Sequence, residues 1–338
     1  MSQNPLLNWK VDRSAIRFVG QALQRPECII AQRDGTLWSA DARGGVMRIS
    51  LDGSQQLLSP KQDHKGEEVS FEQRFIQSQN ASLPNGLALT PEGDFIICNW
   101  GLDRIERLRA NGELVVLHDN LHGKPLGKTN FPLLDSKGRI WFTVTTQMQP
   151  WTDSINAEEA DGYIGVIDDE GIRTVATGVS GANEIRFDED ERWLYVVESN
   201  ARRISRFQVG PDATLSHREV YGPETLEGFP DGFAFDSFGN LWVTLIMTDK
   251  LIAITPEGEV LTLLDDSNPE ATARLYRERD ARALTPQTMQ ATRGELAPWM
   301  ASITFGGPDL KTVYLGSLLG NRIPCFQSPV AGQALIHW

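Results

Sequence analysis

Asp236-Ser237-Phe238-Gly239-Asn240-Leu241-Trp242-Val243 is an acidic turn that leads directly into a run of strand-forming residues. The same order returns along the chain, at Asp34-Gly35-Thr36-Leu37-Trp38, Glu92-Gly93-Asp94-Phe95-Ile96, Asp135-Ser136-Lys137-Gly138-Arg139-Ile140-Trp141, Asp188-Glu189-Asp190-Glu191-Arg192-Trp193-Leu194 and Asp309-Leu310-Lys311-Thr312-Val313-Tyr314. A repeat of about 40–50 residues built from strands and turns is typical of β-propeller blades. The six copies therefore predict an all-β protein, a six-bladed β-propeller.

The bulk composition narrows the function classes. Because blades share one axis, we expect residues 1–338 to form a single domain. The formal net charge of -13 argues against nucleic acid as a partner, since phosphate binding needs clustered Lys and Arg. The first residues lack the basic and apolar pattern of a signal peptide, and no run of about 18 apolar residues occurs. These features predict a cytoplasmic protein with no nucleic-acid or membrane partner; the small-molecule substrate is inferred from the site residues below.

Two stretches depart from the repeat. The short β-rich run 14–19 precedes the first blade, and we expect it to pair with the C-terminal run 322–326 and so close the ring. Residues 265–299 have few β-branched side chains and predict a short helical insertion between blades five and six, with Ser267 or Asn268 as cap and Pro269 in the first turn. The insertion covers either an outer surface or the pocket. Residues 63–75 and 147–161 are expected to be longer loops.

Single polar residues stand just before the innermost strand of each blade. They are Glu27, Asn85, Asn130, Asn183, Asp231 and, with only a hydroxyl, Ser302. Any one of them could simply cap a local turn, since Asn-Gly and Asp-Gly are strong turn formers. As a set in register they point to the same central tunnel, where carboxylate and amide oxygens suit Ca²⁺ and also serve Mg²⁺, Mn²⁺ or Zn²⁺. The pattern thus favours one divalent cation as cofactor.

The same residues carry a resemblance to a known family. The blade entries Pro84-Asn85-Gly86 and Pro230-Asp231-Gly232, the acid Glu27 and the stretch Phe305-Gly306-Gly307-Pro308-Asp309 resemble the senescence-marker protein/gluconolactonase family, which includes regucalcin, bacterial sugar lactonases and diisopropylfluorophosphatase. The similarity runs over essentially the whole chain. It implies a six-bladed propeller with a divalent cation in the tunnel, held by Glu27, Asn183 and Asp231.

The expected function is a metal-dependent lactone hydrolase that acts on a sugar-acid or other small polar lactone. A bound cation polarises a carbonyl and lowers the pKa of water. Asp231 is the candidate general base or water positioner, while Asn130, Lys128 and Asn85 are candidates for binding substrate. Lys128 stands where sugar lactonases commonly have an arginine. The alternatives are an arylester or phosphotriester hydrolase and a non-catalytic ligand-binding propeller.

Overall fold

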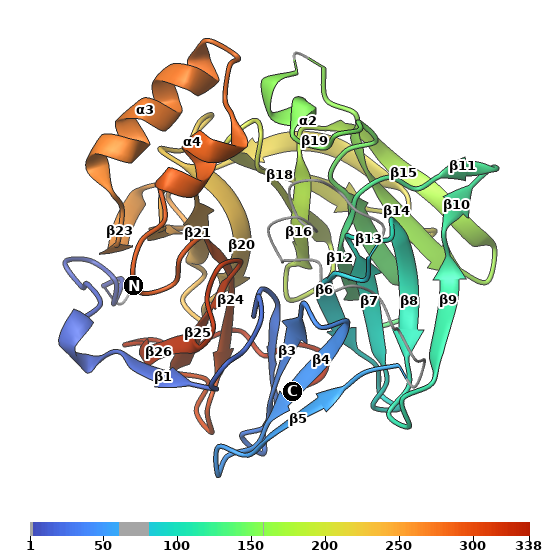
Figure 1. Ribbon diagram of the computed structural model, residues 1–338, viewed down its shortest axis with the longest axis horizontal. Coiled ribbons are helices and arrows are strands. Elements are labelled where there is room, and N and C mark those ends of the chain that lie inside the picture. Colours follow the sequence, from blue (N-terminus) through green and yellow to red (C-terminus); the bar gives the residue numbers. More distant parts are fainter. Residues whose placement is uncertain (1–2, 61–80, 158) are drawn as a thin grey trace.

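The computed structural model describes residues 3–60, 81–157 and 159–338. Within these residues, six antiparallel four-stranded sheets lie around a common centre (Figure 1). The prediction of an all-β six-bladed propeller is therefore confirmed. The loop expected at 63–75 lies outside the described residues, and the extent of a single domain over 1–338 stays a prediction.

The blades follow chain order, and each begins with its innermost strand. Blades one to three comprise β2 (Ile29–Ala31), β3 (Leu37–Asp41), β4 (Gly45–Ile49) and β5 (Gln55–Leu58); β6 (Pro84–Leu89), β7 (Phe95–Asn99), β8 (Arg104–Leu108) and β9 (Leu114–His118); and β12 (Thr129–Leu134), β13 (Ile140–Val144), β14 (Gly162–Asp168) and β15 (Gly171–Val179). Blades four to six comprise β16 (Ala182–Phe187), β17 (Trp193–Glu198), β18 (Arg203–Val209) and β19 (Leu215–Tyr221); β20 (Phe229–Phe235), β21 (Leu241–Ile246), β22 (Lys250–Ile254) and β23 (Val260–Asp265); and β24 (Met300–Gly306), β25 (Thr312–Ser317), β26 (Ile323–Gln327) and β1 (Arg17–Val19). The other elements within the described residues are the hairpin β10 (Asn120–Leu121) and β11 (Lys124–Pro125), the 3-10 helix η1 (Arg13–Ala15), and the helices α2 (Asp153–Asn156), α3 (Pro269–Asp280) and α4 (Pro286–Ala291).

In blades three and five the repeated acidic turn has the same hydrogen-bond pattern. In blade five, Asp236 accepts hydrogen bonds from the backbone N–H groups of Phe238 and Asn240 and from the indole N–H of Trp242, each at 2.8–2.9 Å. Asp135 accepts the corresponding bonds in blade three, including one of 2.8 Å from the Trp141 indole. A single buried carboxylate thus fixes the turn and anchors a buried tryptophan of the next strand.

The ring closes as predicted. The N-terminal strand β1 pairs antiparallel with β26 and completes blade six, with Arg17 opposite Cys325 and Val19 opposite Ile323. Pairing the two ends of the chain in one sheet removes an open gap between first and last blades.

The helical insertion lies between blades five and six, next to β23 (Figure 1). Asn268 caps α3 by accepting from the Ala271 N–H, and Pro269 occupies the first turn, as predicted. Thr285 caps α4 in the same way. No helix in the described parts of the chain is long and apolar enough to span a bilayer.

Candidate functional site

Irregularities in the inner strands aim the predicted residues into the tunnel. In β6, β12, β16 and β20 the pairing register shifts by one residue directly at Asn85, Asn130, Asn183 and Asp231. An extra residue in one strand re-aims the side chains beside it. Gly232 follows Asp231 in such an irregularity, and a Cβ there would lie 2.7 Å from Glu184 Oε1, so the glycine permits close approach of two blades. Asn-Gly and Asp-Gly therefore mark strand irregularities here and not hairpin turns.

Five of the six predicted site residues meet at one cavity of about 70 Å³. They are Glu27, Asn85, Asn130, Asn183 and Asp231, and all five are buried. The cavity has room for several water molecules or a small ligand group. Candidate metal ligands, the candidate base and two of the candidate substrate-binding residues thus share one space.

Lys128 is the sixth predicted residue, and it does not line this cavity. Its ammonium group forms an ion pair of 2.9 Å with Asp103 and donates to the Trp100 carbonyl oxygen at 3.2 Å. The side chain is 2% exposed. Because the charge is used inside the protein, the placement does not support Lys128 as a substrate-binding group; it holds the loop that carries Trp100, which does line the cavity.

Glu27, Asn85, Asn130, Asn183 and Asp231 form the polar side of the cavity, called the floor below. A chain of hydrogen bonds across blades fixes it. The Asn85 amide donates to Glu27 Oε1 at 3.2 Å and to the Asn130 carbonyl oxygen at 3.1 Å. Asn130 in turn donates to Thr145 Oγ1 at 3.0 Å. Arg25 donates to the Asn85 side-chain oxygen. Asn85 is therefore a positioning residue for Glu27 and Asn130, because its own amide is occupied by these contacts.

Two buried oxygens on this floor have no hydrogen-bond partner: Glu27 Oε2 and Asn183 Oδ1. Burial raises the pKa of Glu27 to about 7, against the opposing effect of Arg25. Burial and the neighbouring carboxylates of Glu27 and Glu184 raise the pKa of Asp231 well above its usual range. Unpaired oxygens and crowded carboxylates are costly in a protein interior, and a bound cation offsets both.

The sequence prediction missed two charged residues at the site, Arg25 and Glu184. The Arg25 guanidinium stabilises the charged forms of both Glu27 and Asp231. Glu184 follows Asn183 at the place where Gly86 and Gly232 follow their polar residues in blades two and five. Its Oε1 has no partner, and burial raises its pKa to about 8 although Arg186 acts against the shift. Comparing the second residue of each entry would have singled it out.

The helical insertion contributes to the cavity wall, which answers the question that the sequence left open. Met289 of α4 and Trp299, just before β24, line the cavity with Trp100 and Trp151 from other blades. Trp100 and Trp151 pack edge to face with ring centroids 5.4 Å apart. The insertion thus covers the candidate site and not merely an outer surface.

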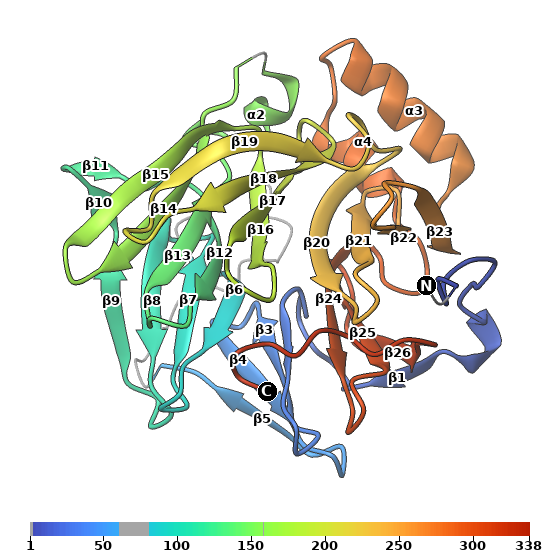
Figure 2. The ribbon, with the colours of Figure 1, turned by 180° about the vertical axis from the view of Figure 1, so that it is seen from behind.

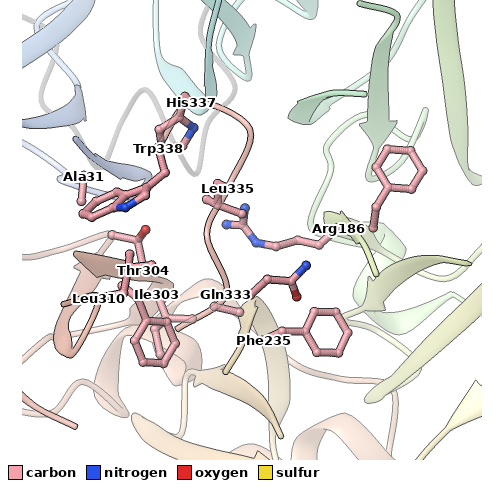
Figure 3. Close-up of a pocket in the computed structure, with 13 residues that line it drawn as sticks. Ala31, Arg186, Phe235, Ile303, Thr304, Leu310, Gln333, Leu335, His337 and Trp338 are labelled. Carbon is pink, nitrogen blue, oxygen red and sulfur yellow. The ribbon is translucent and has the colours of Figure 1, made fainter. Parts of the chain in front are cut away.

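The C-terminal segment crosses the end of the tunnel at which the inner strands finish (Figure 2). Its residues Gln333, Leu335, His337 and Trp338 line a pocket together with Arg186, with Trp338 beside Ala31 (Figure 3). The Gln333 N–H donates to the Phe235 carbonyl oxygen at 2.9 Å. Burial and the Arg186 guanidinium lower the pKa of His337 to about 4, so its ring is neutral at neutral pH. The polar floor lies at the other end of the tunnel, where the inner strands begin and where α4 contributes Met289 to the cavity.

The donor set fits a hard cation. Glu27, Asn183 and Asp231 offer only oxygen, the donor that Ca²⁺ and Mg²⁺ prefer. Within the residues that the structure describes, no three His, Cys, Asp or Glu side chains gather as a metal centre. The candidate site consequently depends on the Asn183 amide oxygen in addition to carboxylates.

Comparison with known proteins assigns the chain to a family. The profile described as SMP-30/Gluconolactonase/LRE-like region matches residues 116–285, just over half of the chain. A 6-deoxy-6-sulfogluconolactonase from Pseudomonas putida is 26% identical over 238 residues, covering 69% of this chain and 68% of the relative. A gluconolactonase structure from Xanthomonas campestris superposes with a TM-score of 0.64 at 18% identity, covering 94% of this chain and 89% of its own. The calcium-binding protein regucalcin from Agrobacterium tumefaciens superposes with a TM-score of 0.63 at 16% identity, covering 94% and 96%. This chain therefore belongs to the SMP-30/gluconolactonase/LRE-like family.

Proposed function

We propose that this chain hydrolyses a lactone in a reaction that depends on a divalent cation held by Glu27, Asn183 and Asp231. One observation carries the proposal: two buried oxygens without partners, Glu27 Oε2 and Asn183 Oδ1, belong to residues that line the same cavity as Asp231. A propeller that served only as a scaffold would gain nothing from orphaned polar atoms in its tunnel. Members of the family named for lactone hydrolysis support the choice of reaction.

The oxygen-only donor set favours Ca²⁺, with Mg²⁺, Mn²⁺ and Zn²⁺ as alternatives. A relative titled as calcium-binding agrees with this order. When bound, the cation supplies Lewis-acid polarisation of the lactone carbonyl and a lower pKa for water beside it.

The remaining work falls to the side chains. In the proposed reaction Asp231, which lines the cavity, accepts a proton from water as the water oxygen bonds to the carbonyl carbon. The ring C–O bond then breaks, the leaving oxygen takes up a proton, and a hydroxy acid results. Arg25 stabilises the charged form of Asp231 that this role requires. Asn85 and Asn130 keep the floor in register, since each bonds to its neighbour. A cytoplasmic location remains part of the proposal.

The test uses the full-length protein and follows proton release from five- and six-membered lactones, with an arylester and a fluorophosphate beside them. Hydrolysis of lactones that stops on chelation and returns on adding a divalent ion is the expected result. Lactone hydrolysis that survives exhaustive chelation contradicts the cation dependence. Turnover of only the fluorophosphate or the arylester favours the alternative hydrolases. Cation binding without any turnover favours a ligand-binding protein.

A further inference from the structure

The cavity has two chemically different sides. Its floor is polar, whereas half of the residues that line it are apolar or aromatic. The apolar side includes Trp151 and Ile155 from the region of α2, Ile246 at the end of β21 with Met247 after it, and Met289 of α4. These side chains come from blades three and five and from the insertion, so they meet only in the folded protein. A ligand that reaches the floor must lie against them.

The polar groups of the wall are already committed to the protein. Thr145 Oγ1 donates to the Ala182 carbonyl oxygen at 2.7 Å, and Ser199 Oγ donates to the Pro230 carbonyl oxygen at 2.6 Å. The Asn200 amide donates to the Ser154 carbonyl oxygen at 3.1 Å. The ammonium group of Lys128 forms an ion pair with Asp103. A sugar ring needs partners for each hydroxyl it buries, because an unpaired buried hydroxyl is costly. The wall of this cavity offers few hydrogen-bonding groups that are available to a sugar hydroxyl.

The helical insertion and the region of α2, which carry the apolar side of the cavity and are called the roof below, are held in place by contacts with other blades. Asn156 and Leu284 exchange two hydrogen bonds of 3.1 Å, from the Asn156 amide to the Leu284 carbonyl oxygen and from the Leu284 N–H back to the amide oxygen. Arg279 donates to the Asn200 carbonyl oxygen at 3.1 Å, and the Arg202 guanidinium lies over the Tyr276 ring at 5.5 Å. The insertion is thus tied to blades three and four, and its apolar side chains are a fixed part of the wall.

From this division we propose that the substrate is a lactone carrying an apolar alkyl or aryl substituent, with its carbonyl on the polar floor and its substituent against Met289 and the tryptophans of the roof. The inference rests on the proposed lactone hydrolysis. It replaces the expectation of a sugar-acid or other polar lactone, because apolar walls gain free energy by removing apolar ligand surface from water.

The first experiment compares kcat/KM for δ-decalactone, which carries a pentyl chain, with unsubstituted δ-valerolactone and with glucono-δ-lactone. We expect δ-decalactone to exceed glucono-δ-lactone by at least about tenfold. A higher kcat/KM for glucono-δ-lactone overturns the inference while leaving lactone hydrolysis intact.

A matched pair of variants tests the role of the roof. Met289→Ala should lower the ratio of kcat/KM for δ-decalactone over δ-valerolactone about tenfold, since it removes apolar contact with the chain. Leu275→Ala is the control, because Leu275 is buried in the same insertion but does not line the cavity. Its ratio should stay that of the wild type. Equal changes in both variants mean that loosening of the insertion, and not contact with substrate, sets the ratio, which contradicts the inference.

A binding experiment separates failure of the inference from failure of the proposed reaction. The probes are 2-pentyltetrahydropyran and 1,5-anhydroglucitol, two cyclic ethers that cannot be hydrolysed, followed by calorimetry and by tryptophan fluorescence. Stronger binding of the pentyl ether supports the apolar class even if no lactone is turned over. Equal binding, or stronger binding of anhydroglucitol, overturns the apolar class even if lactones are hydrolysed.

Discussion

The acidic turns of blades three and five and the tunnel floor all bury carboxylates, but the turn carboxylates are fully hydrogen-bonded and the floor carboxylates are not. Asp236 is 3% exposed, and its two oxygens accept four hydrogen bonds, from two backbone N–H groups, the Asn240 amide and the Trp242 indole. Glu27 is 1% exposed, and one of its oxygens has no partner. Glu184 is likewise fully buried with one oxygen unpaired.

The difference separates stability from function. A saturated carboxylate recovers in hydrogen bonds what it loses in hydration, so it stabilises the blade that it belongs to. An unsaturated carboxylate raises the free energy of the folded protein until a ligand completes it. Carboxylates therefore stabilise the fold at the turns and destabilise it at the floor. A cation or substrate that pairs with the unsatisfied floor oxygens binds more tightly as a result.

The largest expected effect is on activity at the floor. Asp231→Asn should lower kcat/KM for lactone hydrolysis by about 10²–10⁴, because the amide can neither accept the proton from water nor supply a negative charge. Proton-release kinetics measure the loss, and circular dichroism checks that the fold is retained. Asp190→Asn serves as control, since Asp190 is exposed and lies in the turn of blade four. Activity within tenfold of the wild type would remove Asp231 from the reaction.

The next largest effect is on stability at a turn. Asp236→Ala should lower the free energy of unfolding by roughly 3–5 kcal/mol, because two backbone N–H groups and an indole N–H lose their buried acceptor. Urea unfolding measures the change. Asp190→Ala should change it by less than about 0.5 kcal/mol, since its ion pair with Arg192 is exposed. A loss below about 1 kcal/mol at Asp236 would contradict the assignment of the saturated carboxylates to stability.

Asp249 sharpens the comparison, because its carboxylate accepts from the N–H groups of Gly294, Trp299 and Met300 and yet burial raises its pKa to about 6. A raised pKa means that folding favours the protonated acid. Its contribution to stability is therefore fully present below pH 3.8 and is lost as the pH rises through about 6, at most about 3 kcal/mol. The difference in unfolding free energy between wild type and Asp249→Asn, measured from pH 3.5 to 7.5, should fall over this interval. Parallel profiles would argue that hydrogen bonds outweigh burial there.

The smallest expected effect reverses sign with the cation. In chelator, Asp231→Asn should be more stable than the wild type by about 1 kcal/mol, since it relieves a buried carboxylate crowded by Glu27 and Glu184. Saturating Ca²⁺ should stabilise only the wild type, by about 2.7 kcal/mol at a hundred times Kd, and so invert the order. Thermal unfolding with and without Ca²⁺ reports both. A variant that is less stable than the wild type in chelator would mean that crowding by Glu27 and Glu184 does not destabilise the Asp231 carboxylate.

The sequence by itself determined the features that depend on residues close along the chain. The repeated turn and strand predicted six blades, and the N-cap at Asn268 with Pro269 predicted the start of a helix. The polar residue before each inner strand was visible because every blade repeats it, and five of the six predicted site residues do share one cavity.

Only the tertiary structure decided which of these polar groups are satisfied. Lys128 has a charged side chain of the kind that often binds substrate, but its ammonium group forms an ion pair with Asp103 from blade two. Glu184 stands out in the sequence as a charged residue at its blade entry, but only the fold shows that Gly232 of the next blade makes room for it. The roof likewise joins residues as distant as Asn156 and Leu284. Local sequence fixes backbone geometry through turns and caps, whereas the partner of a buried charge is set by whichever distant segment packs against it, and that is decided only when the blades close around the tunnel.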